Sequence, residues 1–333
     1  MQLTFKPYFL TFKNPFGISK LTRKGTDTIL IQLHQNGITG YGEAVLPPYL
    51  KESPKELIEL FSHTSIPDFK ENSLVEIDRL LKQLPSSIED NPSYYAAIDM
   101  ALHDFLSKSL KQSIPSIYNI SSLHQPLSSF TIAFSKTEEI KEKLKDAQEF
   151  NLIKLKLGGT NDLKTINEVR KLSTLPISTD LNQAWNNLDH KLIKLLENSN
   201  CQYLEEPFKD NSELITLKTT IPIIADESFQ GYSSFKNLSP HFNGINIKLM
   251  KCGGLREAYK IIKEAKKREL NILLGCMSGS SCAVSAMSHF TSLADWIDLD
   301  GPALISNDPF TGLSYKKGRI VLKGKNGLGI DLN

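Results

Sequence analysis

The sequence predicts an α/β protein in which a closed β/α barrel follows a smaller α+β region. From about residue 128 onward, short apolar runs alternate with charged amphipathic stretches, as is typical of parallel strands joined by crossover helices. Polar residues near the ends of successive runs recur in steps of 24, 25, 21 and 22 residues, at Lys156, Asp180, Glu205, Asp226 and Lys248. Each step has the length of one βα unit, and eight such runs favour a closed barrel over an open sheet.

The eight predicted strands and the region before them can be placed along the chain. In the first region, residues 26–45 contain two β-rich runs around Asn36-Gly37, a strong hairpin signal, and residues 91–110 have helical periodicity. The barrel strands are expected within SSFTIAF, LIKLKL, PISTDL, QYLEEP, IPIIADE, GINIKLM, NILLGCM and DWIDLDGP. We expect three segments, residues 1–125, residues 126–305, and a C-terminal segment, residues 306–333, that packs back on the first.

Composition and charge indicate a protein that acts on a small molecule. The 333-residue, 37.3 kDa chain is 40% hydrophobic, and its 39 basic and 37 acidic residues leave a net charge of only +2. Because no basic patch stands out, we expect neither a nucleic-acid partner nor a membrane partner. The four cysteines form no CxxC pair, and no signal-like or membrane-spanning apolar run is visible, so we expect a cytoplasmic protein. A homo-oligomer is one possible assembly.

Three carboxylates stand at consecutive strand ends of the predicted barrel. Asp180, Glu205 and Asp226 would converge at one mouth, because parallel strands bring their carboxyl ends together. Three carboxylates repel one another unless a cation compensates them, and oxygen ligands favour a hard divalent ion, so the sequence predicts a Mg²⁺ site. Glu206 points to the other side of its strand than Glu205 and is expected to be a structural partner.

Lysines flank this predicted centre on both sides. Lys154 and Lys156 are two residues apart in LIKLKL, so both ammonium groups leave the same face of the strand. Lys248 ends the strand that follows the acids. A lysine in a desolvated pocket beside a cation has a lowered pKa, which suits a general base near neutrality. Taken alone, the two strand lysines would fit a solvated edge strand, but the neighbouring acids favour the functional interpretation.

The ordered motifs around these residues resemble the enolase superfamily, in its muconate-lactonizing subgroup. They are KLKLG, DLNQAW, YLEEP, ADES and NIKLMKCGG, with GYGEA and AAIDMALHDFLSK before the barrel. The resemblance implies a modified (β/α)7β TIM-type barrel with an α+β capping domain. Lys154 would be an auxiliary that lowers the pKa of Lys156 and contacts the substrate carboxylate. The other implied roles are metal ligands at Asp180, Glu205 and Asp226, acid/base residues at Lys156 and Lys248, and supporting residues behind the ligands at Asn182 and Glu227.

A further motif, DWIDLDGP, narrows the subgroup. Asp298 and Asp300 are two residues apart at the end of the last strand, which is similar to the DxD signature of dipeptide epimerases. In those enzymes the pair receives the N-terminal ammonium of the substrate. The alternative is that the two carboxylates cap local backbone N–H groups. Many relatives carry an acidic residue where CMSGSS has Gly279, and this departure concerns the shape of the dipeptide pocket.

Further candidate substrate contacts are Arg23, Cys276 and Ser278. Arg23 lies with Lys20 and Lys24 in an early loop, where the charges fit a solvated surface as well as a reader of the substrate side chain. The stretch SGSS has no paired base, so we expect close backbone packing around the substrate rather than a nucleophile.

Together these features predict a Mg²⁺-dependent dipeptide epimerase that inverts the α-carbon of the C-terminal residue, with an Ala-Glu-like dipeptide as leading candidate. One lysine would remove the α-proton, the metal would stabilise an enediolate, and the opposite lysine would return a proton to the other face. Within the superfamily the alternative is an o-succinylbenzoate synthase or cycloisomerase, which needs no ammonium site. The alternative of another class is a non-catalytic peptide-binding protein, which needs no base on each side.

Overall fold

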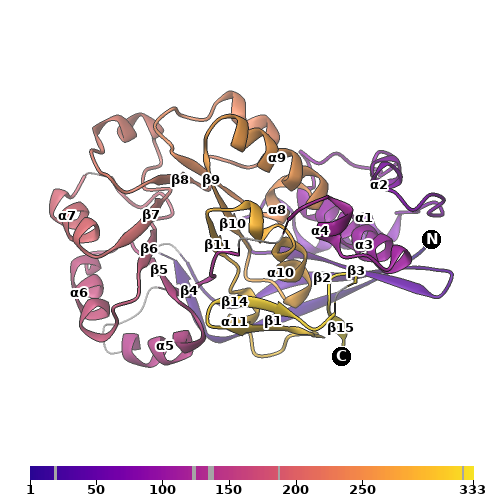
Figure 1. The fold of residues 1–333 in the computed structure, drawn as a ribbon, viewed down its shortest axis with the longest axis horizontal. Coiled ribbons are helices and arrows are strands. Elements are labelled where there is room, and N and C mark those ends of the chain that lie inside the picture. Colours follow the sequence, from indigo (N-terminus) through magenta and orange to yellow (C-terminus); the bar gives the residue numbers. More distant parts are fainter. Residues whose placement is uncertain (19–20, 122–124, 134–138, 187, 325) are drawn as a thin grey trace.

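The computed structural model describes the whole chain except residues 19–20, 122–124, 134–138, 187 and 325, and the side chains of residues 16–18, 21 and 22. Lys20 therefore lies outside the described residues. A barrel of parallel strands occupies one side of the molecule, and an antiparallel sheet with its helices occupies the other (Figure 1). The predicted TIM-type barrel with an α+β cap is confirmed.

The N-terminal strands form a three-stranded antiparallel sheet in the order β1-β2-β3. The strands are β1 (Gln2–Ile18), β2 (Leu21–Gln35) and β3 (Ile38–Leu46). The predicted hairpin is present, because Gln35 pairs with Ile38 and the two residues between them, Asn36 and Gly37, have φ angles of 52° and 77°. Both residues tolerate positive φ, which a two-residue turn of this hand requires.

Four helices complete the capping region, and the longest of them lies between the sheet and the barrel. They are α1 (Pro54–Ser62), α2 (Leu74–Leu81), α3 (Pro92–Leu110) and α4 (Ile114–Ile117). Helix α3 coincides with the predicted helix and contacts both β3 and a short barrel helix, α8 (Leu249–Cys252). Gly40 and Gly42 permit the contact with β3, because a Cβ atom on either would lie 2.0 Å from a carbonyl oxygen of α3.

Eight parallel strands form the barrel, one for each apolar run that predicts a strand. Their order around the sheet is sequential. A parallel bridge between Ser128 and Ile297, with a hydrogen bond of 3.0 Å from Leu299 N to Ser128 Oγ, joins the last strand to the first. The strands are β4 (Ser129–Ile132), β5 (Leu152–Lys156), β6 (Ile177–Asp180), β7 (Cys201–Glu205), β8 (Ile223–Ala225), β9 (Gly244–Ile247), β10 (Asn271–Gly275) and β11 (Trp296–Asp298).

Helices surround the barrel, although two connections differ from the predicted βα pattern. After β7 and β8 the chain forms only 3-10 helices, η3 (Asn211–Thr216) and η4 (Tyr232–Lys236). These are the two shortest steps, of 21 and 22 residues, which leave little chain for a crossover helix. No helix in the described part of the chain is both long and apolar enough to cross a bilayer. The remaining helices are α5 (Ile140–Asp146), η2 (Ala147–Glu149), α6 (Asp162–Leu172), α7 (His190–Asn198), α9 (Leu255–Lys267), α10 (Ser281–Ser288), η5 (Thr291–Leu293) and α11 (Gly301–Leu304).

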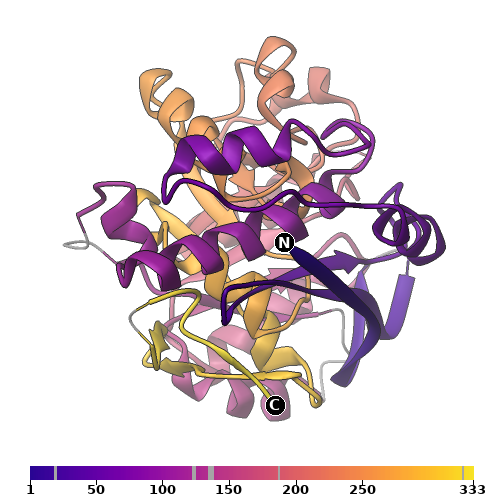
Figure 2. The same cartoon turned by 90° about the vertical axis from the view of Figure 1, so that its right-hand side faces the viewer.

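The last residues form two small antiparallel pairs, β12 with β15 and β13 with β14. The C-terminal segment lies beside the capping region (Figure 2). Among the contacts between them, Leu328 N donates to Asp104 Oδ1 at 2.7 Å, and the rings of Phe310 and Tyr41 meet edge to face. The division into residues 1–125, 126–305 and 306–333 stays a prediction. The strands are β12 (Phe310–Thr311), β13 (Leu313–Lys316), β14 (Arg319–Leu322) and β15 (Asp331–Leu332).

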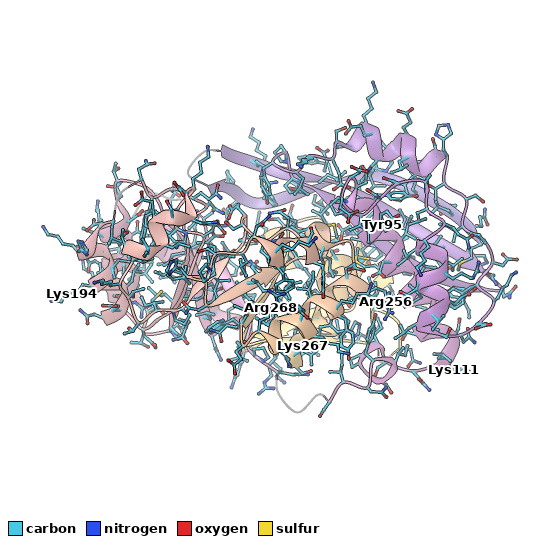
Figure 3. The ribbon with its side chains drawn as sticks, turned by 90° about the horizontal axis from the view of Figure 1, so that it is seen from above. Tyr95, Lys111, Lys194, Arg256, Lys267 and Arg268 are labelled. Carbon is cyan, nitrogen blue, oxygen red and sulfur yellow. The ribbon has the colours of Figure 1, made fainter. Side chains whose placement is uncertain are left out.

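An ion pair also joins the capping helices to the barrel. Arg256 on α9 donates to both carboxylate oxygens of Asp78 on α2, at 2.8 and 2.6 Å. Figure 3 shows Arg256 at the boundary with the capping helices, whereas Lys194 on α7 lies at the opposite end of the molecule. The capping domain is thus held to the segment that follows β9, where Lys248 lies.

Candidate active site

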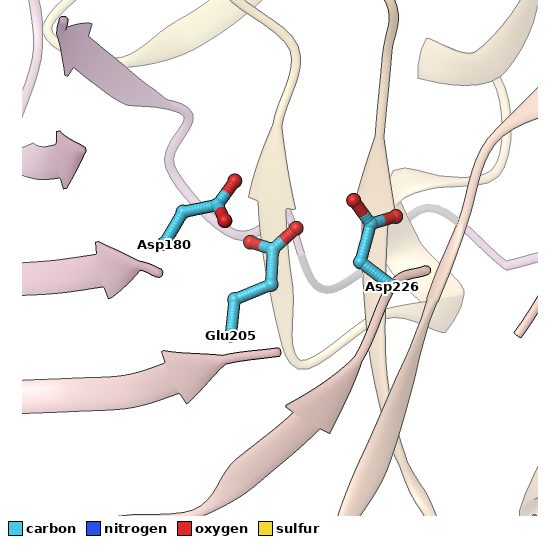
Figure 4. Close-up of side chains that lie close together, drawn as sticks. All are labelled: Asp180, Glu205 and Asp226. Atoms are coloured by element: carbon cyan, nitrogen blue, oxygen red, sulfur yellow. The ribbon is translucent and has the colours of Figure 1, made fainter. Parts of the chain in front are cut away.

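The three carboxylates predicted as metal ligands meet at the mouth of the barrel. Asp180 and Glu205 are paired neighbours at the ends of β6 and β7, and Asp226 directly follows β8. Each offers an oxygen atom within 4.8 Å of the other two, and all three residues are buried. Figure 4 shows the carboxylates turned toward one another from neighbouring strands.

The chemistry of this cluster fits a hard divalent cation. Carboxylate oxygens are the ligands that Mg²⁺ prefers, and the repulsion among three buried carboxylates needs positive charge between them. Glu205 Oε2 accepts no hydrogen bond among the described residues, although Lys154 Nζ lies 2.7 Å away as an ion-pair partner. Burial, which has the larger effect, and the negative charge of Asp180 together raise the pKa of Glu205 to about 7. A bound cation would favour the ionised form of this carboxylate.

Lys156 and Lys248 lie on opposite sides of the carboxylate cluster. Lys156, at the end of β5, places Nζ 2.5 Å from Asp180 Oδ2, and Lys248, directly after β9, places Nζ 2.7 Å from Asp226 Oδ2. Burial acts to lower the pKa of Lys248, but the carboxylates of Asp226 and Glu205 outweigh it and raise the pKa. The lowered pKa expected from the sequence would therefore require a cation to replace Lys248 as the partner of Asp226.

Lys154 is surrounded by carboxylates. It is 1% exposed, and Nζ lies 2.6 Å from Asp298 Oδ2, 2.7 Å from Glu205 Oε2 and 3.3 Å from Asp180 Oδ2. Asp298 also accepts a hydrogen bond of 2.6 Å from Ser129 Oγ. Burial acts to raise the pKa of Asp298, but Lys154 outweighs it and holds the pKa below its ordinary value. Asp298 is already paired, which differs from the expectation that both acids of the DLD motif are open to an ammonium group.

Asp300 has no cation within ion-pair distance in the described part of the chain. It is 3% exposed, and Oδ2 accepts a hydrogen bond of 2.6 Å from Thr131 N on β4. Burial and then the charge of Asp298 raise the pKa of Asp300 to about 7. A buried carboxylate is stabilised by a charged donor, and an ammonium group is one.

Asn182 connects one candidate ligand to the residues around it. Its backbone N–H donates to Asp180 Oδ1 at 3.1 Å, and its side chain accepts from Lys156 Nζ at 3.2 Å. The side-chain amide also donates to Glu227 Oε1 at 3.0 Å. Burial and then the charge of Asp226 raise the pKa of Glu227 to about 8. These contacts support the proposal that Asn182 holds Asp180 and Lys156 in position and that Glu227 holds Asn182.

Two residues at the site were missed by the sequence analysis. Asn246 Nδ2 donates to Glu205 Oε1 at 2.8 Å, and Lys251 Nζ donates to Asp226 Oδ1 at 2.7 Å. The signals were present: Asn246 precedes Lys248 by two residues and so leaves the same face of β9, and Lys251 follows it by three, the spacing of one helical turn. Each polar residue stands in an otherwise apolar run.

Glu206 is a structural partner, as expected. Its Oε2 accepts hydrogen bonds from the backbone N–H groups of Asp226 and Ser228 at 2.7 and 3.1 Å, and Ser228 Oγ donates to its Oε1 at 2.5 Å. Glu206 therefore fixes the backbone of the third candidate ligand and leaves Glu205 to face the cluster.

Arg23 lies between two aromatic rings of the capping domain. Its Cζ lies 5.4 Å from the ring centroid of Phe12 and 5.5 Å from that of Tyr49, and its Nη1 donates to Thr26 Oγ1. Burial lowers the pKa of Arg23, and none of the described acidic side chains forms an ion pair with it. The Tyr49 hydroxyl lies 3.5 Å from Met277 Sδ, which connects this group to the segment after β10.

The segment after β10 contains Cys276, Ser278 and Gly279. Cys276 directly follows the strand, and burial raises the pKa of its thiol; Ser278 is half-buried. Gly279 packs against the capping domain, because a Cβ atom there would lie 2.7 Å from Val45 Cγ2 on β3. An acidic side chain at this position would therefore require the Val45 side chain to shift.

Two family models match most of the chain. Residues 137–333 match the model described as enolase C-terminal domain-like, and residues 6–117 match the N-terminal domain of mandelate racemase / muconate lactonizing enzyme. The chain belongs to the mandelate racemase and muconate lactonizing enzyme family of the enolase superfamily. The resemblance carried by the strand-end motifs is confirmed.

This enolase-superfamily chain is also similar to individual relatives along its full length. The L-Ala-D/L-Glu epimerase of Bacteroides thetaiotaomicron is 34% identical, over 99% of this chain and 88% of the relative. The L-Ala-D/L-amino acid epimerase of a Maribacter species is 33% identical, over 100% of both chains. Among solved structures, the N-succinyl Arg/Lys racemase from Bacillus cereus superposes with a TM-score of 0.87 at 26% identity, covering 99% of this chain and 95% of the other.

Proposed function

We propose that this enolase-superfamily protein is a Mg²⁺-dependent dipeptide epimerase, an isomerase that inverts the α-carbon of the C-terminal residue. The observation that carries the proposal is the position of Lys156 and Lys248, one on each side of the carboxylate cluster. Inversion by proton transfer needs a base on one face of the carbon and an acid on the other. The two full-length relatives, an L-Ala-D/L-Glu epimerase and an L-Ala-D/L-amino acid epimerase, support this reaction class.

Asp180, Glu205 and Asp226 would hold the metal ion. When bound, Mg²⁺ would supply positive charge beside the substrate carboxylate, where negative charge develops as the α-proton leaves. Lys154 would add a fixed positive charge on the Lys156 side, because buried carboxylates hold its ammonium. A neighbouring positive charge favours the neutral form of Lys156, which is the form that accepts a proton.

The two lysines would exchange roles with the direction of the reaction. In one direction Lys156 removes the α-proton and Lys248 returns a proton to the opposite face; in the other direction Lys248 is the base. Lys248 is buried and Lys156 is partly buried, and the carboxylate that each contacts holds its ammonium group in place, which preserves the orientation of each base relative to its face.

The amino end of the dipeptide would bind at Asp300. Its carboxylate is buried and has no cationic partner among the residues that the structure describes, whereas Asp298 is neutralised by Lys154. We therefore assign the ammonium contact to Asp300, with Asp298 as the group that holds Lys154 in place.

An acidic side chain on the C-terminal residue, as in Ala-Glu, would pair with Arg23. Arg23 is partly buried and has no acidic partner among the described residues, and a guanidinium group in such a place favours a carboxylate, which it can bind with two parallel hydrogen bonds. Gly279, which packs against Val45, brings no negative side chain that would oppose such a substrate.

Two rival functions are less well supported by the site. An o-succinylbenzoate synthase or cycloisomerase has no amine to bind, so the lack of a cationic partner for Asp300 among the described residues counts against it. A non-catalytic peptide-binding protein needs no lysine on each side of the metal position.

The four cysteines are unpaired, which supports a reducing cytoplasm as the place of action.

A dipeptide library in deuterated water tests the proposal. The purified protein with Mg²⁺ is incubated with each L,L-dipeptide, and mass spectrometry detects one deuterium at the α-carbon of the C-terminal residue while chiral chromatography detects the epimer. We expect Ala-Glu to be among the fastest substrates. A complete absence of exchange across the library would refute the function.

A further inference from the structure

Lys251 is a buried lysine whose three ammonium protons are all engaged. It is 8% exposed, and Nζ donates to Asp226 Oδ1 at 2.7 Å and to the carbonyl oxygens of Asp226 and Asn246 at 2.8 and 3.0 Å. An ammonium group has three donors, so none is left for a substrate. Lys248, by contrast, donates only to Asp226 Oδ2 among the described residues.

The two lysines reach one carboxylate because a single helical turn separates them. Lys248 precedes α8, and the N–H of Lys251 donates to the Lys248 carbonyl oxygen at 3.0 Å. Residues three apart on a helix share a face, so both side chains extend toward Asp226. Gly253 and Gly254, with φ angles of 90° and 114°, end the turn in a conformation that other residues rarely adopt.

We propose that Lys251 is a positioning residue for the reaction, in that it fixes the Asp226 carboxylate so that Oδ2 faces both the metal position and Lys248. This inference rests on the proposed function. Without Lys251, Lys248 would be the one side-chain donor to the Asp226 carboxylate among the described residues, and the carboxylate could pair with it through either oxygen. The geometry of one metal ligand and of one base would then be lost together.

The opposite side of the site does not depend on Lys251. Lys156 is held by Asp180 Oδ2 and by Asn182, and Asp180 Oδ1 is held by the Asn182 backbone. A positioning role for Lys251 therefore affects one face of the substrate carbon more than the other. A purely structural role, in which Lys251 only stabilises the barrel mouth, would weaken both faces to the same extent.

The first measurement is α-proton exchange in deuterated water, made separately with each epimer of Ala-Glu. Lys251→Met should lower exchange of the epimer whose proton faces Lys248 by about tenfold or more, while exchange on the Lys156 face changes much less. Lys251→Gln retains an amide donor and should show the same asymmetry to a smaller extent, which keeps the comparison available if the Met variant does not fold. The control is Lys260→Met, since Lys260 is 51% exposed and pairs with Glu257 on its own helix, α9.

The second measurement is Mg²⁺ binding by calorimetry, which needs no turnover. The Kd of Lys251→Met should rise by about tenfold relative to the parent and to Lys260→Met, because Asp226 no longer presents a fixed oxygen. Equal loss of exchange on both faces, or unchanged Mg²⁺ affinity, would overturn the proposal. If the parent exchanges no α-proton with any dipeptide, the proposed function fails, whereas the calorimetric comparison still tests the hold on Asp226.

Discussion

The ammonium group of Lys154 lies 2.6 Å from Asp298 Oδ2, so a side-chain ion pair links the second strand of the barrel to the last, two strands that are not neighbours in the sheet. This contact makes the two acids of the DLD motif electrostatically different, because it neutralises Asp298 and leaves Asp300 without a cationic partner in the described structure. Breaking a buried ion pair leaves an uncompensated charge and is strongly destabilising. Asp298 and Asp300 should therefore respond differently to substitution.

Replacing Asp300 with asparagine should weaken recognition of the free amine. We expect kcat/KM for Ala-Glu to fall by about 10- to 150-fold, which corresponds to about 1.5–3 kcal/mol for a hydrogen bond to a charged group. N-acetyl-Ala-Glu should be a poor substrate for the parent and should lose little more in Asp300→Asn.

The matched variant is Asp298→Asn, which should lower kcat and thermal stability because it leaves Lys154 without its closest counter-ion. If the parent used Ala-Glu and N-acetyl-Ala-Glu with equal kcat/KM, Asp300 would have no amine to hold, and the synthase or cycloisomerase alternative would become the better interpretation.

Binding of the dipeptide should depend on pH through Asp300. Burial and the charge of Asp298 raise its pKa to about 7, so in the free protein the carboxyl group is mostly protonated below pH 7 and ionised above it. Only the ionised form pairs with an ammonium group, so affinity should rise between pH 6 and pH 8. The Kd of Ala-Glu, measured by calorimetry at pH 6 and at pH 8, should change more in the parent than in Asp300→Asn. An identical pH dependence in both proteins would assign the effect to another group.

Activity should require a divalent metal, because three buried carboxylates need charge compensation. Chelation should abolish epimerisation, and added Mg²⁺ should restore it. Mg²⁺ should also raise the Tm of the parent, since a ligand at about 100 times its Kd adds about 2.7 kcal/mol to the stability of the folded state. Asp226→Asn should reduce this shift. Full activity in a preparation shown to be free of metal would contradict the mechanism.

The sequence predicts the barrel and the carboxylate cluster well, because both follow from local periodicity. Strand runs are short and apolar, and parallel strands end at the same mouth, so Asp180, Glu205 and Asp226 could be placed together without knowing any tertiary contact. The hairpin at Asn36-Gly37 was predictable for the same reason, since its conformation is decided by two adjacent residues.

Contacts that depend on barrel closure, or on which side of a short helix packs against the protein, were not predictable to the same degree. The pairing of Lys154 with Asp298 joins residues 144 positions apart and exists only because β11 returns beside β4. Lys251 was overlooked because a lysine in a helical run usually indicates a solvated face, whereas α8 is a single turn packed under α3. The connections after β7 and β8 differ because their steps, the two shortest, leave little chain for an α-helix, and the expected βα pattern did not take this into account.

The two acid/base lysines should be separable by stereochemistry, because each faces one side of the α-carbon. Lys156→Ala should leave Lys248 able to exchange the α-proton of one epimer with deuterium, and Lys248→Ala should show the complementary preference. Neither variant should interconvert the epimers at more than about 1% of the parent rate, since a positioned acid or base contributes about 10²–10⁴-fold. Nuclear magnetic resonance of each epimer separately gives both rates. Epimerisation at the parent rate in either variant would refute the assignment of two bases.

Arg23 should set the charge preference at the C-terminal side chain. It has a lowered pKa from burial and no acidic partner among the described residues, so a substrate carboxylate would supply the missing counter-charge. Arg23→Gln should reduce the ratio of kcat/KM for Ala-Glu over Ala-Gln by about tenfold or more, because a charge-assisted hydrogen bond is lost. Lys24→Gln is the matched control, since Lys24 is the adjacent, exposed cation and should leave the ratio unchanged.

Whether Arg23→Gln changes KM or kcat distinguishes recognition of the substrate side chain from a general effect on the capping domain. Arg23 contacts Tyr49 and Phe12 but none of the candidate metal ligands, so its replacement should act mainly on KM for the acidic substrate and leave kcat for Ala-Gln close to that of the parent. An equal fall in kcat/KM for both dipeptides would mean that Arg23 supports the capping domain rather than reading the side chain. The acidic preference would then have to come from another group at the mouth, and the Ala-Glu assignment would lose its structural basis while the epimerase assignment, which rests on Lys156 and Lys248, would stand.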